Sequence, residues 1–377
     1  MNQLFTETYE QSKEEFWRKE EKLKKKWSEV DRESINVCDD QTLTLDLIHC
    51  KANLSKRALV ITTGLHGIEG YVGSAMMNLF IERFSGMLDE MDTSLILMHA
   101  INPWGMKYFR KVNEHNVDLN RNFIFNRETD DLSNESYVKA KSLLEPKGGL
   151  GWFEFGSRLL KTMMSMNKKE LTAAVTMGQY INKEGVYYGG DRCESATVYL
   201  QDYFQKFFLM YDQVVLLDMH TGYGPSKQMH LVNSRFDDES PDFWKQALKY
   251  PYISETTADS FYKINGDMID FLYQFKNQVS PSTKLFATTF EFGTLGETLL
   301  AQLQSLKTTI EENAAYFYGD RKSRDKTREC LKKLYDPNDS SWREKAVRDA
   351  IQAFEGIIHT FFEDGSWPQS LPKKSKI

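Results

Sequence analysis

The chain has 377 residues, of which 41% are hydrophobic and 27% are charged, which is an ordinary composition for a globular protein of one or two domains. Its 48 Lys and Arg residues against 54 Asp and Glu residues give a formal net charge of −6, so no electrostatic attraction draws it to nucleic acid or to an anionic membrane surface. No apolar run has membrane-spanning length, no basic-then-apolar leader opens the sequence, and the 4 cysteines show no paired spacing; we therefore expect a cytoplasmic protein.

The first predicted element is an amphipathic helix near the N-terminus. Residues 7–33 are rich in Glu and Lys, and apolar side chains recur at steps of 4, 7, 7 and 4 residues. This spacing places them on one face of a helix, with the charges on the solvated side. We expect the helix to pack on the body of the protein, within an N-terminal helical extension of residues 1–40. The apolar positions are Phe5, Tyr9, Phe16, Leu23 and Trp27.

Apolar runs of strand length begin at residue 43. Leu43, Leu45 and Leu47 alternate with polar residues, which is typical of a half-buried strand. Four later runs have the composition of strands that are covered on both faces, and helical patterns lie between them. This alternation predicts a single α/β domain over residues 41–320. The four runs are 58–63, 94–99, 213–218 and 285–292, and the helical patterns include 73–84 and 156–180.

The last predicted helix has the clearest pattern. Ser341 and Glu344 have the spacing of a capping box, and an apolar stripe follows at helical intervals. We expect residues 321–377 to form a C-terminal helical tail that belongs to the same globule. The stripe consists of Trp342, Val347, Ile351, Phe354, Ile358 and Phe361.

Polar clusters with glycine accompany each of the four buried-type strands. GLHGIEG (64–70) follows the first strand, and the segment after the second leads to Arg110 and to Asn120 and Arg121. His220 follows the third strand, and Glu291 lies within the fourth. Because ligands bind at the carboxyl ends of the strands in open α/β sheets, we expect these side chains to share one rim.

Two histidines and a glutamate in these clusters suit a metal site. His66 and Glu69 are three residues apart, and His220 on a distant strand supplies a third ligand. A catalytic zinc takes three such ligands and keeps a fourth position for water. The His66–Glu69 pair alone is a weak signal, because His-x-x-Glu occurs by chance. Asp218 is either a buried structural carboxylate or the partner that fixes an imidazole tautomer.

Signatures of other hydrolases and of nucleotide-binding proteins are missing from the sequence. It has no Gly-x-Ser-x-Gly, no His-Glu-x-x-His and no glycine-rich phosphate loop. His99 and His115 lie near the predicted rim without a carboxylate at matching spacing, so we interpret them as structural. Cys193 is the one cysteine in a suggestive loop, and we expect it to be a small buried residue.

The order His-x-x-Glu, Arg, Asn-Arg, His, Glu resembles the zinc carboxypeptidases and their relatives, the aspartoacylase and succinylglutamate desuccinylase deacylases. The resemblance spans about residues 40–320 and is closest to a mainly bacterial branch of that superfamily. It implies an open mixed β-sheet with helices on both faces. The strings that carry it are TTGLHGIEGYVGSA, INPWGMKYFRKVNEHNVDLNRNF, LLDMHTGYG and TFEFGT.

The resemblance also implies a role for each matching residue. His66, Glu69 and His220 correspond to the ligands of one Zn²⁺ per chain, and Glu291 corresponds to the general base. Asn120 and Arg121 correspond to the pair that grips a substrate carboxylate. Arg110 corresponds to the arginine that polarises the scissile carbonyl, although the adjacent Lys111 leaves the placement of that cation open.

These roles predict a zinc-dependent amide hydrolase of the carboxypeptidase type, acting on a peptide with a free carboxylate. The alternatives are an N-acyl amino-acid deacylase and a non-catalytic zinc-binding module on the same fold. Residues 124–190 are extra material that we expect to form a pocket wall or a lid. The family's mobile tyrosine has three candidates here, and the sequence leaves the oligomeric state open. The candidates are Tyr223, Tyr262 and Tyr273.

Overall fold

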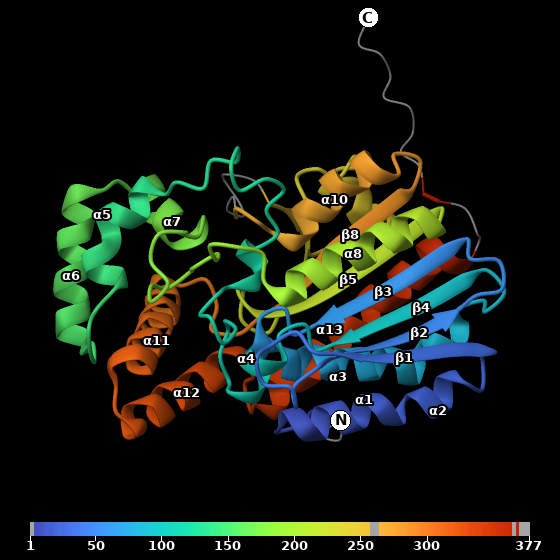
Figure 1. Ribbon diagram of the computed structural model, residues 1–377, viewed down its shortest axis with the longest axis horizontal. Helices are drawn as coiled ribbons and strands as arrows, with labels where there is room; N and C mark the ends of the chain where they lie inside the picture. The colour runs from blue at the N-terminus through green and yellow to red at the C-terminus, as the bar shows by residue number, and fades with distance from the viewer. Residues whose placement is uncertain (1–3, 257–263, 364–366, 369–377) are drawn as a thin grey trace, which may run out of the picture.

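The structure is a computed structural model that describes residues 4–256, 264–363 and 367–368, and the strands in these residues form one eight-stranded sheet (Figure 1). The strand order is β1-β2-β4-β3-β5-β8-β6-β7. β4, β3, β5 and β8 are parallel, whereas β2 and β6 flank them antiparallel. The predicted single α/β domain with an open mixed sheet is confirmed. The strands are β1 (Glu29–Ile35), β2 (Leu45–Lys51), β3 (Arg57–Thr63), β4 (Thr93–His99), β5 (Gln213–Gly222), β6 (Met229–Asn233), β7 (Ile253–Glu255) and β8 (Lys284–Gly293).

Helices cover both faces of this sheet, as predicted. One apolar cluster joins the sheet to α1, α3 and α13, and a second joins its other face to α8 and α10. The helices are α1 (Tyr9–Arg18), α2 (Glu20–Leu23), α3 (Gly70–Arg83), α4 (Pro103–Lys107), α5 (Glu135–Leu144), α6 (Trp152–Ser165), α7 (Lys168–Thr176), α8 (Ser195–Met210), α9 (Pro241–Ala247), α10 (Met268–Val279), α11 (Leu299–Tyr318), α12 (Arg321–Tyr335) and α13 (Ser340–Ile358), with short 3₁₀ turns η2 (Gly67–Glu69), η3 (Ser85–Met87) and η4 (Leu119–Arg121) and a closing π turn, His359–Glu363.

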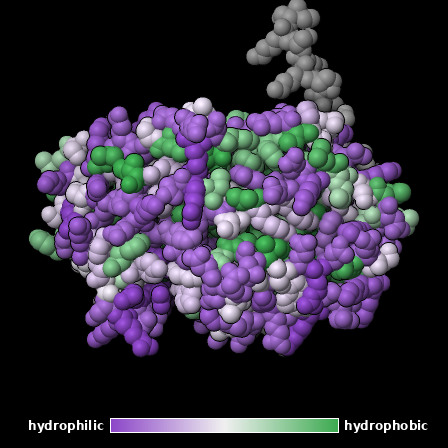
Figure 2. All heavy atoms as spheres, in the orientation of Figure 1, coloured by the Kyte–Doolittle hydropathy of each residue, from purple (hydrophilic) through white to green (hydrophobic). Residues whose placement is uncertain are grey.

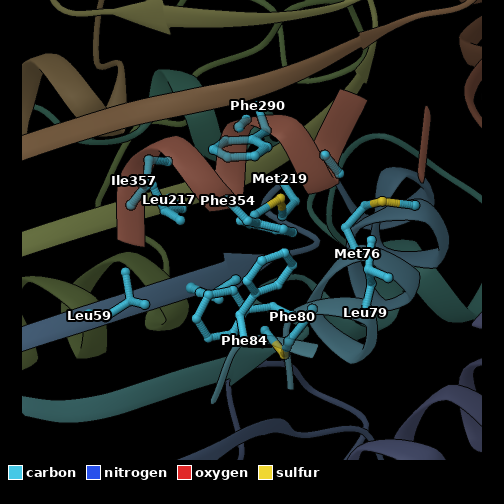
Figure 3. Packing of buried hydrophobic residues seen from close by; sticks show 14 of the residues in the cluster. Leu59, Met76, Leu79, Phe80, Phe84, Leu217, Met219, Phe290, Phe354 and Ile357 are labelled. Carbon is cyan, nitrogen blue, oxygen red and sulfur yellow. The ribbon is translucent and has the colours of Figure 1, made fainter. Parts of the chain in front are cut away.

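The core on the α3 face joins segments that are far apart in the sequence (Figure 3). The ring centroid of Phe354 on α13 lies 5.2 Å from that of Phe80 on α3 and 5.2 Å from that of Phe290 on β8. Leu217 and Met219 of β5 face the same cluster. The apolar side chains of α13 lie in this core. The hydrophobic interior is therefore complete only when α13 packs against the sheet and α3.

The N-terminal segment is helical over a shorter stretch than predicted. The five apolar residues of the predicted stripe are buried, but the helices end at Leu23, and residues 29–35 form the edge strand β1. The prediction of a helix up to residue 33 is wrong for this part. The indole Nε1 of Trp27 donates to the carbonyl of Thr93, which fixes the chain at the sheet edge. The mostly polar segment after it then pairs its backbone with β2.

Three other local predictions need correction. The predicted helix over 156–180 is interrupted, because Asn167 and Glu170 form a capping box that starts α7 after α6 has ended. The side chain of Asp339, not Ser341, caps α13. β2 is buried on both faces rather than half-buried, since its side chains enter both apolar clusters.

Five helices gather at one end of the sheet, namely α5, α6, α7, α11 and α12 (Figure 1). The first three come from residues 124–190, and they pack on α11 through an apolar cluster of their own. Hydrophilic side chains cover most of the face in Figure 2, with hydrophobic ones in small groups among them. Among the described residues, no helix has the length and apolar character that crossing a membrane requires.

Candidate metal centre

The three predicted metal ligands come from two neighbouring strands. His66 and Glu69 lie on the turn η2 that follows β3, and His220 lies near the end of β5, which pairs with β3. Gly67 lets this turn pass close to α4, because a Cβ atom at residue 67 would lie 2.2 Å from the carbonyl carbon of Gly105. The turn therefore depends on glycine to bring His66 and Glu69 to β5.

The ligand atoms of these residues converge on one point. His66 Nδ1 lies 3.0 Å from Glu69 Oε1 and 3.2 Å from His220 Nδ1, and His220 Nδ1 lies 3.2 Å from Glu69 Oε2. All three side chains are buried, with residue exposures of 6%, 2% and 4% for His66, Glu69 and His220. The two imidazoles lower the pKa of Glu69 well below its usual range although burial opposes its charge. The carboxyl group of Glu69 therefore favours its ionised form, which a metal ligand requires.

The outer nitrogens of both imidazoles are held by carboxylates. His66 Nε2 lies 2.9 Å from Asp118 Oδ1, and His220 Nε2 lies 2.6 Å from Asp218 Oδ2. Carboxylates at these positions hold the protons on Nε2, so the two Nδ1 lone pairs face each other and the charge of Glu69. Burial opposes a positive charge on His220, but Asp218 and Glu69 raise its pKa well above the usual value, so this point favours a cation, either a proton or a metal ion. The residues therefore fit a zinc ion bound by two nitrogens and one carboxylate.

Glu291 lies beside this group. Its strand β8 pairs with β5 so that Glu291 is opposite His220, and its Oε1 accepts a hydrogen bond of 2.9 Å from the backbone N–H of Tyr223. Burial and the nearby charge of Glu69 raise the pKa of Glu291 to about 7. A carboxylate with this pKa can accept and return a proton near neutral pH.

Asn120 and Arg121 lie on the turn η4, and protein groups hold both side chains. The Asn120 side chain donates to Asp267 Oδ2 and accepts from the backbone N–H of Met268, each at 2.9 Å. The terminal nitrogens of Arg121 donate to Asp118 and, at 3.2 Å, to the carbonyl of Thr176. Its Nε is buried and has no hydrogen-bond partner among the described residues. The two residues reach the metal centre through Asp118.

Arg110 is paired with a carboxylate of the cavity that adjoins the candidate metal centre. Its Nε and Nη2 donate to the carboxylate of Glu312 on α11 at 2.6 and 3.2 Å, and its guanidinium carbon lies 3.7 Å from the ring centroid of Tyr316. The Arg110 residue has no exposed surface. Arg110 and Lys111 both line the cavity beside Asp118, and Nη1 of Arg110 is a buried donor without a hydrogen-bond partner among the described residues.

The structure describes two of the three candidate tyrosines and brings one of them to Glu291. Tyr262 lies outside the described residues, and Tyr273 is buried in the core with its hydroxyl on Asp237 Oδ2 at 3.0 Å. Tyr223 meets Glu291 through its backbone. Sequence reasoning missed Tyr335 on α12 and Tyr187, which both line the cavity near Asp118. No local motif marks them, because only the fold brings their segments to the strand ends.

Helices enclose the centre. The cavity that adjoins it has a volume of about 20 Å³ and includes Lys111, Asp118, Tyr187, Glu312 and Tyr335 in its lining. α12 closes this side through a 2.6 Å hydrogen bond that the hydroxyl of Thr221 donates to the carbonyl of Tyr335. Val186 and Tyr187 of the segment 124–190 therefore form part of the cavity wall, together with residues of α11 and α12.

One further group of the described residues combines a histidine with carboxylates. Asp39, Glu114 and His115 lie together at the surface, and His115 Nδ1 lies 2.6 Å from Glu194 Oε2. This group is exposed, in contrast to the three buried ligands above.

A protein-family model described as a protein of unknown function, DUF2817, matches residues 5–349. No curated protein is similar enough to the chain to count as a match.

Several solved structures resemble the chain over most of its length. Bovine thrombin-activatable fibrinolysis inhibitor, in complex with tick carboxypeptidase inhibitor, shares 13% identity at a TM-score of 0.48, covering 85% of this chain and 99% of that chain. Carboxypeptidase A from Helicoverpa armigera shares 12% identity at a TM-score of 0.43, covering 79% and 71%. The ectoine utilization protein EutE (DoeB) from Ruegeria pomeroyi shares 15% identity at a TM-score of 0.37, covering 77% and 67%. With TM-scores below 0.5, none of these likenesses assigns a function to this chain.

Proposed function

The chain belongs to the DUF2817 family of proteins of unknown function, and we propose that it is a zinc-dependent amide hydrolase in which Glu291 is the general base. The observation that carries the proposal is the convergence of two Nδ1 atoms and one carboxylate within 3.2 Å of one another. His66, Glu69 and His220 would hold one zinc ion. When bound, zinc supplies a Lewis acid that polarises an amide carbonyl and makes water acidic enough to attack at neutral pH.

Other residues around this centre would transfer the proton and hold the imidazoles in place. Glu291 accepts a proton from the attacking water as the water oxygen bonds to the carbonyl carbon. Glu291 then returns that proton to the nitrogen as the carbon–nitrogen bond breaks, which leaves a carboxylate and an amine. Asp118 and Asp218 keep the two imidazoles in the orientation that binds a metal.

We place the carboxylate of the substrate near Asn120 and Arg121. The planar fork of an arginine suits a carboxylate, and Arg121 Nε is a buried donor that lacks a partner among the described residues. Binding there requires Arg121 to release the carbonyl of Thr176, because Asp118 and Thr176 occupy its two terminal nitrogens. Arg121→Lys should therefore raise KM for substrates with a free carboxylate and leave esterified ones nearly unchanged.

The alternative of the same chemistry is an N-acyl amino-acid deacylase. The cavity of about 20 Å³ beneath α11 and α12 holds no more than about one water molecule, so its size does not choose between a compact substrate and a peptide. Turnover of a panel of N-acyl amino acids and of peptides with different C-terminal residues separates the two.

The test of the proposed function combines metal analysis with one substitution. Wild-type protein should contain about one zinc per chain and lose activity to a chelator but not to a thiol reagent. Glu291→Gln keeps the size of the side chain but cannot accept a proton, so kcat should fall by about 10²–10⁴ while zinc remains bound. Full activity in Glu291→Gln, or in the zinc-free protein, contradicts the proposal.

A further inference from the structure

The helix α6 packs on the protein with one side and exposes apolar side chains on another. Phe155 is buried in the apolar cluster that α6 shares with α5, α7 and α11, and Leu159 packs against that cluster. Five other large apolar side chains of α6 are exposed, more than on any other helix that the structure describes. We call these five residues the outer face of α6. They are Trp152, Phe153, Leu160, Met163 and Met164, with exposed fractions of 49%, 93%, 62%, 56% and 83%.

The outer face is one continuous strip of the helix surface. At about 3.6 residues per turn, its five side chains fall within about a third of the helix circumference, beside the strip that holds Phe155. Figure 1 shows α6 at the left edge of the molecule, outermost among the helices that gather at that end. Because Phe155 and Leu159 already attach α6 to the protein, the fold does not require the outer face to be apolar. A contiguous apolar group on a surface is typical of an interaction site.

The charge around α6 is opposite in sign to that of the whole chain. Residues 147–169 contain five basic side chains and one acidic side chain, whereas the whole chain has 48 Lys and Arg residues against 54 Asp and Glu residues. The five helices at this end, α5, α6, α7, α11 and α12, contain 14 basic and 7 acidic residues in total. The net charge of −6 therefore does not describe this end of the molecule.

Several of these basic side chains have no acidic partner within the fold. The ion pairs of this region occupy Lys139, Lys141 and Arg158. Four exposed lysines on α6 or close to it in the sequence form no ion pair with any residue that the structure describes, and they remain able to bind an external anion. These are Lys147, Lys161, Lys168 and Lys169.

The combination of an apolar strip with free lysines distinguishes between possible partners. A second copy of this chain, joined through its own α6, would bring the same lysines together. A nucleic acid would attract the lysines but leave the outer face in water. A bilayer with anionic lipids suits both features, because its headgroup phosphates attract lysines and its acyl chains take up apolar side chains. α6 has 14 residues, fewer than the roughly 20 that span a bilayer, so it would lie along the surface.

We propose that α6 binds the surface of an anionic lipid bilayer, with its outer face among the upper acyl chains and the four lysines at the headgroups. The helices that pack on α6 then hold the rest of the protein at the membrane. This inference is independent of the proposed function, because it involves none of the metal-centre residues and its test requires no hydrolysis.

The experiment measures flotation of the full-length protein with lipid vesicles. The vesicles contain either phosphatidylcholine alone or equal parts of phosphatidylcholine and phosphatidylglycerol. One variant, Phe153→Ser with Met164→Ser, makes the outer face polar, and a second replaces Lys161, Lys168 and Lys169 with Gln.

Each variant has a matched control at another surface. Leu209→Ser with Met210→Ser removes two exposed apolar side chains from the end of α8. Replacement of three exposed lysines with Gln, beside α2 and at the amino ends of β3 and β8, changes the net charge equally. These lysines are Lys25, Lys56 and Lys284.

Wild-type protein should float with the anionic vesicles, less so at high salt, and only weakly with phosphatidylcholine alone. The Phe153 and Met164 variant should bind the anionic vesicles about 10- to 100-fold more weakly. The lysine variant should lose about fivefold for each charge, or about 10² in total. Both controls should bind as wild type does. Because all the replaced side chains are exposed, the urea midpoints of the variants should stay the same.

Three results would overturn the inference. Wild-type protein that stays unbound with anionic vesicles has no such surface. Binding that the two control variants weaken as much as the two α6 variants depends on overall composition and not on α6. A wild-type dimer in sedimentation equilibrium that Phe153→Ser with Met164→Ser converts to a monomer assigns the outer face to a second copy of the chain.

Discussion

At the residue scale, the two histidines of the candidate metal centre are each held by an aspartate, and the two aspartates lie in different kinds of structure. Asp118 belongs to the loop before η4 and also binds Arg121, whereas Asp218 lies two residues before His220 on the same strand. Asp218 accepts a further hydrogen bond of 2.6 Å from the hydroxyl of Thr62 on β3. The strand ladder therefore fixes His220, and a loop fixes His66.

His220→Ala should remove most of the zinc and leave the fold largely intact. The remaining two ligands cannot complete the site, but β5 keeps its ladder with β3 and β8. Elemental analysis of the purified variant and its circular dichroism spectrum check both parts. His230→Ala, on the nearby strand β6, is the matched control and should keep its metal. Full zinc occupancy in His220→Ala would show that another residue is the ligand.

The Arg110–Glu312 pair is expected to contribute stability rather than catalysis. Both side chains are buried, and either one alone would leave an uncompensated charge in the interior. Arg110→Met should lower the free energy of unfolding by about 3–5 kcal/mol, and Arg110→Met combined with Glu312→Met should recover most of that loss. Urea unfolding of the two single variants and the double variant measures the coupling. Simply additive losses would mean that the two charges do not depend on each other.

At the element scale, the candidate metal centre depends most on the conformation of the turn η2, which positions His66 and Glu69. The turn packs against α4, and the backbone N–H groups of Gly67 and Ile68 donate to the carbonyls of Lys111 and Arg110 in the segment after α4. On the other side of the turn, α12 packs on Ile68 with three apolar side chains, those of Leu331, Leu334 and Tyr335. The position of His66 and Glu69 thus depends on contacts with two helices that are far apart in the sequence.

Gly67→Ala should destabilise the protein and disturb the metal centre together. The new methyl group would lie 2.2 Å from Gly105 C and 2.3 Å from Met106 N, and backbone atoms cannot yield as a flexible side chain can. We expect a loss of about 2–3 kcal/mol in the free energy of unfolding and a lower zinc content. Gly86→Ala is the control, because a Cβ atom there meets no heavy atom within 4 Å. Equal stability of the two variants would contradict the close packing of η2.

At the scale of the whole molecule, the carboxyl groups of the buried Asp270 and the half-buried Asp237 make stability depend on pH. Burial and the charge of Asp267 raise the pKa of Asp270 to about 7, and burial raises the pKa of Asp237 to about 6. Both values lie above the unfolded value of about 4. The folded state therefore binds more protons, and the stability that these groups contribute is present below pH 4 and lost as pH rises through 6 to 7.

Asp270→Asn should remove its share of this dependence. Asparagine keeps an oxygen that can accept from the hydroxyl of Ser234, which now donates to Asp270 at 2.6 Å, but it never ionises. The variant should gain on the order of 2–4 kcal/mol relative to wild type between pH 4 and pH 8. Urea unfolding of both proteins across this range gives the difference directly. A constant difference between them would show that Asp270 ionises as easily in the folded state as in the unfolded one.

The sequence by itself determined the central architecture and pointed to the candidate metal centre. Continuous apolar runs could only be covered strands, which is why β3, β4, β5 and β8 were found near their observed bounds. The polar residues at their ends then had to share one edge of the sheet, and His66, Glu69 and His220 do converge there. The strands follow from local patterns, whereas the convergence of the three side chains also needs the contacts of η2 with α4 and α12.

Only the tertiary structure decided how the surrounding side chains are used. Arg110 and Lys111 are adjacent cations in the sequence, and only the fold pairs Arg110 with Glu312 on α11. Tyr335 reaches the centre because α12 folds back over the strand ends. β1 and β6 carry weak apolar patterns and exist because neighbouring strands offer their backbones partners. Such contacts join residues up to 202 positions apart, so no local pattern could encode them.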